Sequence, residues 1–325
     1  MKRLLLCLAL AAAVLPAAAR DTDGVLSLVL RPNCGAPAMA VPGGAFDVLL
    51  REAAPVELVS GTKAWRLETA WGAPREGRQP GRCTLPADIP PGRYGIRAAE
   101  AERLDTNPGV VHVLESFPDD YVVAQLGGVP TDGADALLRQ ARDAGAVFAV
   151  VTGSAVAEDT PAAWTRAVRT LAEAPLPIYV VPTALGTPAF ARYFGPGGHV
   201  FRFGLDAYLA FDTTGAPPAD AEAAQLAWIY PARRSVRDAR WSIGLTRRYG
   251  LGMAMRAQIT LFVDDPLDAI LADAVPTFED APLPTAPWGR TALFASGDVP
   301  LQLLRIGPTI QRVAPTADTA DDTVE

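Results

Sequence analysis

Short apolar runs alternate with turn residues over the first third of the chain. The four clearest runs are residues 25–30, 46–50, 94–97 and 110–114. Segments rich in Pro and Gly precede the second and third runs, and none of the four has the 3.6-residue period of a helix. Short strands separated by such turns are typical of an all-β sandwich. We therefore predict a β-sandwich domain over residues 22–116.

A different pattern begins near residue 117. Three continuous apolar runs follow, at residues 121–126, 147–151 and 178–181. Runs of this kind are typical of strands that are buried on both faces of a sheet. Segments with helical spacing separate them: the first begins at Thr131 or Asp132, and the second opens with Thr160-Pro161, which places Pro at the first helical position. This β-α-β-α-β order predicts parallel strands joined by crossover helices.

The pattern after residue 199 is less regular. It predicts a hairpin of strands 200–203 and 207–211, a helix over 219–229, and strands at 241–245, 267–272, 291–296 and 301–306. We assign residues 117–310 to this second domain. The tail, residues 311–325, contains mainly small and polar residues, and we predict that it is disordered.

The first 19 residues resemble a secretory signal peptide. Lys2-Arg3 precedes an apolar run that extends to Leu15, and a site of small residues ends at Ala19. The apolar run is shorter than the roughly 20 residues that span a bilayer, and a buried helix is its alternative interpretation. We expect a secreted or periplasmic protein without a membrane span.

Export would affect the oxidation state of the cysteines. Removal of a signal peptide takes away Cys7 and leaves Cys34 and Cys83. An even number of cysteines in an exported protein favours a Cys34–Cys83 disulfide, and two buried thiols are the alternative.

The formal net charge is -7, and no long cluster of Lys and Arg is present to follow a phosphate backbone. We therefore expect no nucleic-acid partner.

Several strand ends resemble those of calcineurin-like metallophosphoesterases. In that family, strands that correspond to 147–154 and 178–186 end in Gly-Asp and in Pro followed by Gly-Asn-His, where this chain has Gly153-Ser154 and Pro182-Thr183-Ala184-Leu185. Further partial matches occur in the same order at residues 194–196, 209–213, 225–228 and 241–246. The resemblance implies an α/β fold of layered αββα type. Residues 22–116 then resemble the Ig-like domain of secreted bacterial members.

The metal ligands of that family are missing here. Nine positions form what we call the vestigial cleft: Gly128, Pro130, Ser154, Thr183, Ala184, Leu185, Arg247, Ala274 and Pro276. Two-metal hydrolysis needs several carboxylate and imidazole ligands to hold both cations. Neutral hydroxyls are the closest substitutes at these nine positions, and Arg247 adds a positive charge. We expect no catalytic residue, no metal and no other cofactor there.

The resemblance and the missing ligands together predict a pseudo-phosphoesterase, an exported binding or scaffold protein with a protein or glycan partner. The alternative is a hydrolase with a rebuilt site. Ser154 is its candidate nucleophile and His199 its candidate base, although Ser154 lacks the Gly-x-Ser-x-Gly pattern. A weak Ca²⁺ site made from Asp264, Asp265, Asp268, Asp273, Glu279 and Asp280 is a third hypothesis, and a solvated acidic surface is the plainer interpretation.

Overall fold

The computed structural model describes residues 24–100, 103–128, 134–182, 188–211, 228–248, 260–265, 293–295 and 300–313. Within these ranges the chain has a mixed α/β architecture with four sheets and few helices. The predicted signal peptide, the tail beyond residue 313 and the strand predicted at 267–272 lie outside the described residues. No helix within the described ranges is long and apolar enough to cross a membrane.

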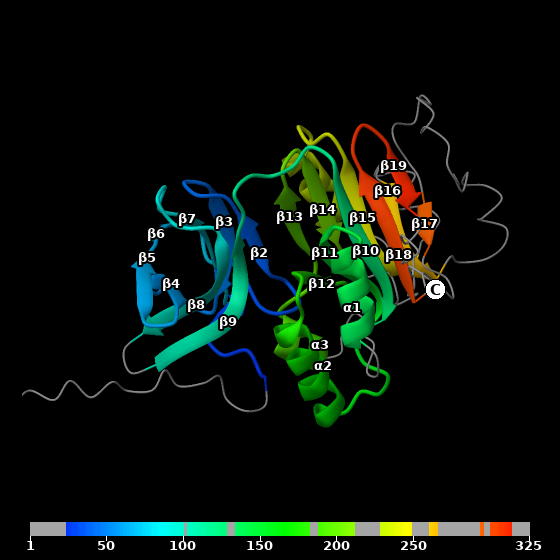
Figure 1. Ribbon diagram of the computed structural model, residues 1–325. Helices are drawn as coiled ribbons and strands as arrows, with labels where there is room; N and C mark the ends of the chain where they lie inside the picture. The colour runs from blue at the N-terminus through cyan, green and yellow to red at the C-terminus, as the bar shows by residue number, and fades with distance from the viewer. Residues whose placement is uncertain are drawn as a thin grey trace, which may run out of the picture.

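The first two sheets contain only strands that precede residue 114 (Figure 1, blue to cyan). One has the order β1 (Val29–Arg31), β3 (Ala45–Leu50), β7 (Gln79–Thr84) and β6 (Glu68–Trp71). The other has the order β2 (Ala38–Ala40), β9 (Arg103–Val113), β8 (Gly92–Glu100), β4 (Val56–Ser60) and β5 (Lys63–Arg66). Val48, Leu58 and Ile96 belong to one apolar core that both sheets share. Alternation of buried and exposed residues along β3 matches a strand with one face on such a core.

The other two sheets contain only strands that follow residue 120. One has the order β12 (Ile178–Val180), β11 (Ala146–Ser154), β10 (Tyr121–Gly128), β18 (Leu301–Ile306) and β19 (Ile310–Val313). The other has the order β13 (His199–Phe203), β14 (Asp206–Ala210), β15 (Ser242–Arg248), β16 (Thr260–Asp265) and β17 (Leu293–Ala295). The predicted parallel pairing of β10, β11 and β12 and the predicted β13–β14 hairpin are confirmed.

These two later sheets face each other across a second apolar core. On β11, Phe148 and Val150 belong to the core between the sheets, while Ala149 and Val151 belong to a third core on the opposite face. The helices α1 (Ala134–Asp143), α2 (Pro161–Glu173) and α3 (Pro188–Phe194) cover that opposite face (Figure 1). Burial on both faces explains why β11 is apolar throughout.

Local sequence accounts for where α2 begins. The Thr160 side chain accepts a hydrogen bond from the Ala163 N–H, and Pro161 occupies the first helical position, as the sequence predicts. Trp164, Val168 and Leu171 are buried on one face of the helix. The short helix α3 was not predicted, although Phe190, Tyr193 and Phe194 are buried in the same core.

The predicted Cys34–Cys83 disulfide is wrong. Neither cysteine forms a disulfide, and both are buried in different cores: Cys34 in the one beneath the helices, and Cys83 in the one between the first two sheets. Asn33 and Gly35, the neighbours of Cys34, form hydrogen bonds with residues from the second half of the chain. Val180 donates from its N–H to the Gly35 carbonyl oxygen (2.7 Å), and Asn33 Nδ2 donates to that of Phe194 (2.9 Å).

Candidate functional site

Three of the nine positions of the vestigial cleft are described, and they lie at strand ends. Gly128 and Ser154 are the last residues of the parallel neighbours β10 and β11, and they pair with each other. Arg247 is the penultimate residue of β15 in the facing sheet. The other six positions, Pro130, Thr183, Ala184, Leu185, Ala274 and Pro276, lie outside the described residues.

The parallel strands of the two sheets run in the same direction. Tyr121, the first residue of β10, donates a hydrogen bond to Asp206, the first residue of β14 (2.9 Å). Trp241 lies immediately before β15, and its Nε1 donates to the Gly307 carbonyl oxygen (2.8 Å). Gly307 follows Ile306, the residue of β18 that pairs with Tyr121. The strand starts therefore lie together, and the carboxyl ends share the opposite edge.

Side chains between the sheets change from apolar to polar toward that edge. Along β11, Thr152 and Ser154 continue the face that carries Phe148 and Val150, since alternate residues of a strand share a face. On β10, Gln125 continues the face of Tyr121 and Val123 in the same way. Gln302 of β18 pairs directly with Gln125. We call Gln125, Thr152, Ser154 and Gln302 the polar layer.

Hydrogen bonds connect most of the polar layer. Gln302 Nε2 donates to Gln125 Oε1 (3.3 Å), and Gln125 Nε2 donates to Thr152 Oγ1 (3.2 Å). Thr152 Oγ1 in turn donates to the Leu126 carbonyl oxygen (3.4 Å). Gln125 and Thr152 have no exposed surface, so these bonds offset the cost of burying their polar groups. One sign of the polar layer was already present in the sequence, since Gln125 is a lone amide in the apolar run 121–126.

Arg247 adds a cation at the same edge. Its side chain continues the face of Ile243 and Leu245, which belong to the core between the sheets, and it is half-buried. Its Nε is buried and has no hydrogen-bond partner in the described ranges. A guanidinium group at this place opposes the binding of a metal cation nearby.

The residues that the structure describes at this edge do not fit a metal pair. Across the described residues, no group of three or more His, Cys, Asp or Glu side chains lies close enough together to hold a metal ion. Of the six residues of the proposed acidic Ca²⁺ site, only Asp264 and Asp265 are described, at the end of β16. The polar layer and Arg247 therefore offer neutral amides, hydroxyls and a guanidinium, and the end of β16, parallel to β15, adds two carboxylate residues.

The structure does not bring Ser154 and His199 together. His199 lies close to Tyr179, with 6.2 Å between ring centroids, and Tyr179 pairs with Val150. Ser154 lies four residues further along β11, which corresponds to about 13 Å of extended strand. Its hydroxyl donates instead to the Val156 carbonyl oxygen (2.5 Å). A serine nucleophile activated by this histidine is therefore not supported.

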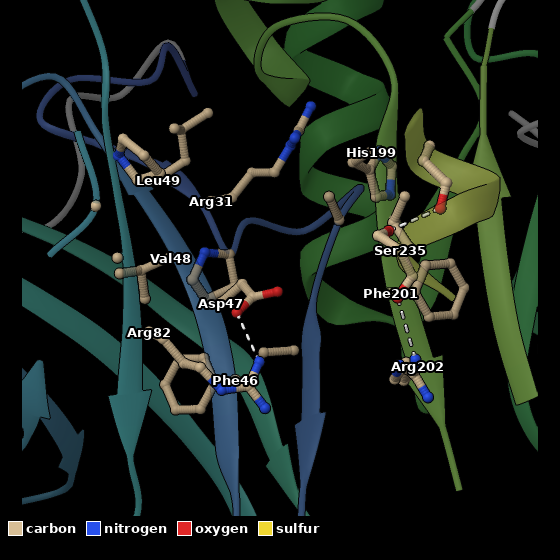
Figure 2. Close-up of a pocket in the computed structure, with 18 of the residues that line it drawn as sticks. Arg31, Phe46, Asp47, Val48, Leu49, Arg82, His199, Phe201, Arg202 and Ser235 are labelled. Atoms are coloured by element: carbon tan, nitrogen blue, oxygen red, sulfur yellow. Dashed lines mark hydrogen bonds and ion pairs between the residues drawn. The ribbon is translucent and has the colours of Figure 1, made fainter. Parts of the chain in front are cut away.

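A cleft with a volume of about 1050 Å³ lies elsewhere. One wall comes from β3 and β7 of the first sheet, and the other from β13 and the helical residues 228–235 (Figure 2). None of the three described vestigial positions lines it. Its walls come from segments distant in the sequence, so no local pattern could have predicted it. We call it the interlayer cleft.

Comparison with known proteins adds little to this picture. No protein-family model and no curated protein sequence matches the chain. Among solved structures, the chain is similar to a purple acid phosphatase from yellow lupin (Lupinus luteus) seeds, with a TM-score of 0.39 and 12% identity over 70% of this chain and 57% of that chain. An amylomaltase from Corynebacterium glutamicum gives a TM-score of 0.20 and 16% identity over 38% of this chain and 23% of that chain. Likenesses this weak carry no argument about activity.

Proposed function

We propose that this chain is an exported binding or scaffold protein with a phosphoesterase-like αββα domain and an Ig-like domain before it. In this proposal the edge that would hold two metals instead holds the polar layer. The observation that carries the proposal is the set of side chains at the ends of β10, β11 and β15. Gly128, Ser154 and Arg247 stand there, with Gln125 and Thr152 hydrogen-bonded behind them.

The chemistry of these groups supports binding rather than phosphoester hydrolysis. Two-metal hydrolases need anionic ligands that hold both cations and generate a hydroxide nucleophile near neutral pH. Amide and hydroxyl side chains hold hydrogen-bonding ligands, but they are weak ligands for paired divalent cations. Arg247 increases the positive charge at the edge and so favours an anionic group over a metal.

Metal content and turnover test this proposal directly. We expect residues 20–325, purified from the periplasm, to contain less than stoichiometric Mn, Fe and Zn and not to hydrolyse p-nitrophenyl phosphate or bis(p-nitrophenyl) phosphate. A Gln125→Leu, Ser154→Ala variant, prepared in parallel, measures the background from contaminating host enzymes. Chelator-sensitive turnover that this variant loses would replace the binding proposal with the alternative hydrolase.

A further inference from the structure

The interlayer cleft carries an excess of positive charge in a chain of formal net charge -7. Its lining includes four arginines and a single carboxylate: Arg31, Arg75, Arg82, Arg202 and Asp47. Two of the arginines already have partners. Arg82 Nη1 donates to Asp47 Oδ1 (3.0 Å; dashed in Figure 2), and Arg202 Nη2 donates to Asp238 Oδ1 (2.6 Å). Arg31 and Arg75 form no ion pair among the described residues.

Arg31 is the least compensated of these cations. Its Nη2 donates to the carbonyl oxygens of Pro196 and of Gly197 (3.0 Å for Gly197), which orients the guanidinium toward the start of β13. Its Nε is buried and has no acceptor within the part of the chain that the structure describes. Burial and the nearby positive charge of Arg78 lower the pKa of Arg31 to about 10, so the group stays charged at neutral pH. A half-buried charge without a counter-ion raises the free energy of the folded state.

His199 adds a second polar group on the facing wall (Figure 2). Its Nε2 is buried and has no hydrogen-bond partner among the described residues. Burial and the charge of Arg31 hold the pKa of His199 well below its usual value, which keeps the imidazole neutral at pH 7. A neutral imidazole in the tautomer protonated at Nε2 can donate a hydrogen bond to an anion.

We propose that the interlayer cleft binds an oxyanion, a phosphate, sulfate or carboxylate group carried by a larger polar molecule, and that Arg31 is its principal charged contact. A guanidinium attracts such a group by its charge and donates charge-assisted hydrogen bonds to it. Arg75 strengthens the attraction from the exposed rim, and His199 contributes a hydrogen bond from the facing wall. The open volume of about 1050 Å³ leaves room for the rest of the ligand. This inference uses no residue of the polar layer, so it stands or fails separately from the proposed function.

Thermal unfolding with simple anions tests the site. Phosphate, sulfate, glucuronate and, as the uncharged match, glucose are titrated at constant ionic strength against NaCl. We expect Tm to rise saturably with at least one anion and not with glucose, because a ligand that binds only the folded state stabilises it. The anion that gives the largest rise identifies the preferred group.

Three variants decide whether the effect belongs to this cleft. Arg31→Gln should weaken anion binding by about tenfold or more, as expected when a charged hydrogen-bonding partner is lost. Arg75→Gln, which changes only the rim, should weaken it by a smaller factor and keeps the test valid if Arg31→Gln does not fold. Arg142→Gln removes an exposed arginine of α1 that does not line the cleft and should leave affinity unchanged. Equal losses in Arg75→Gln and Arg142→Gln, or no Tm rise with any anion, would overturn the proposal.

Discussion

Arg240 holds the carboxylate of Asp206 by two parallel hydrogen bonds. Its Nε donates to Oδ1 (3.0 Å) and its Nη2 to Oδ2 (2.6 Å), while Asp206 is completely buried. Tyr121 and the Trp241 N–H donate to the same carboxylate, at 2.9 and 3.0 Å. Tyr121 belongs to β10 and Asp206 to β14, so this cluster connects the two facing sheets at their strand starts.

We predict that Asp206→Asn lowers the free energy of unfolding by about 3 kcal/mol, because it removes the buried carboxylate charge that pairs with Arg240. Urea unfolding at pH 7 measures the change. Arg202→Gln is the matched control, since it breaks an ion pair whose partner Asp238 is exposed, and it should change stability far less. Similar losses in both variants would show that burial does not set the strength of the Asp206 cluster.

The two cysteines give a second prediction. Without reductant, we expect denatured protein to react with iodoacetamide at both Cys34 and Cys83, since the two thiols lie in separate cores. Native protein should react slowly at Cys83, because burial raises the pKa of its thiol to about 11 and little thiolate exists at pH 8. Mass spectrometry of the alkylated protein counts the modified residues. Failure to alkylate either cysteine after denaturation would indicate a disulfide and contradict the fold described for residues 24–36.

His112 gives a prediction about acid stability. Burial, with a smaller effect of Arg93, lowers its pKa in the folded state from 6.5 to about 4. The unfolded chain therefore takes up the proton first as the pH falls, and stability is lost between pH 6.5 and about 4. The loss from this residue should reach at most about 3 kcal/mol. The lowered pKa of His199 acts in the same direction.

Urea unfolding at pH 7 and pH 4.5 tests this assignment. The difference between the two pH values should be smaller in His112→Gln than in the natural sequence, because the amide does not titrate in this range. An unchanged difference would assign the acid sensitivity to other groups.

The spacing of hydrophobic residues and the residues at turns and helix ends were enough to predict much of the fold. The run 121–126 became β10, and Thr160-Pro161 begins α2 as predicted. The short strand β2, with only three residues, carries no period that a sequence can show. The path of Cys34 depends on hydrogen bonds to residues about 150 positions away, such as Gly35 with Val180, and no local pattern encodes them.

The candidate site was predictable only in part. The sequence was enough to predict that Gly128, Ser154 and Arg247 lie at strand ends, because apolar runs and short family motifs are both local features of a sequence. The polar layer depends on which face of β10 turns inward, and Gln125 shows its role only when Gln302 stands opposite it. The interlayer cleft depends on the approach of Arg31 to Gly197, which are separated by 166 residues.

The contact between β8 and α2 gives a last prediction. Arg93 Nη1 donates to the Ala174 carbonyl oxygen (3.0 Å), and Nη2 donates to that of Ala172 (2.6 Å), at the C-terminal end of α2. These carbonyls have no partner within the helix, and a cation there also offsets the negative end of the helix dipole. Arg93→Met should therefore lower the free energy of unfolding by about 1 kcal/mol and speed hydrogen exchange in the last turn of α2.

Arg97→Met is the control for this contact. Arg97 lies on the same strand, but its partner Glu57 belongs to the same N-terminal sheet. It should therefore lower stability without a local change of exchange in α2. Hydrogen exchange followed by mass spectrometry separates the two variants, because Arg93, unlike Arg97, donates hydrogen bonds to carbonyl oxygens of α2 and its C-cap. Equal protection of α2 in Arg93→Met and the natural sequence would show that α2 ends stably without Arg93, and that other contacts, such as the Gly35–Val180 hydrogen bond, hold the two halves of the chain together.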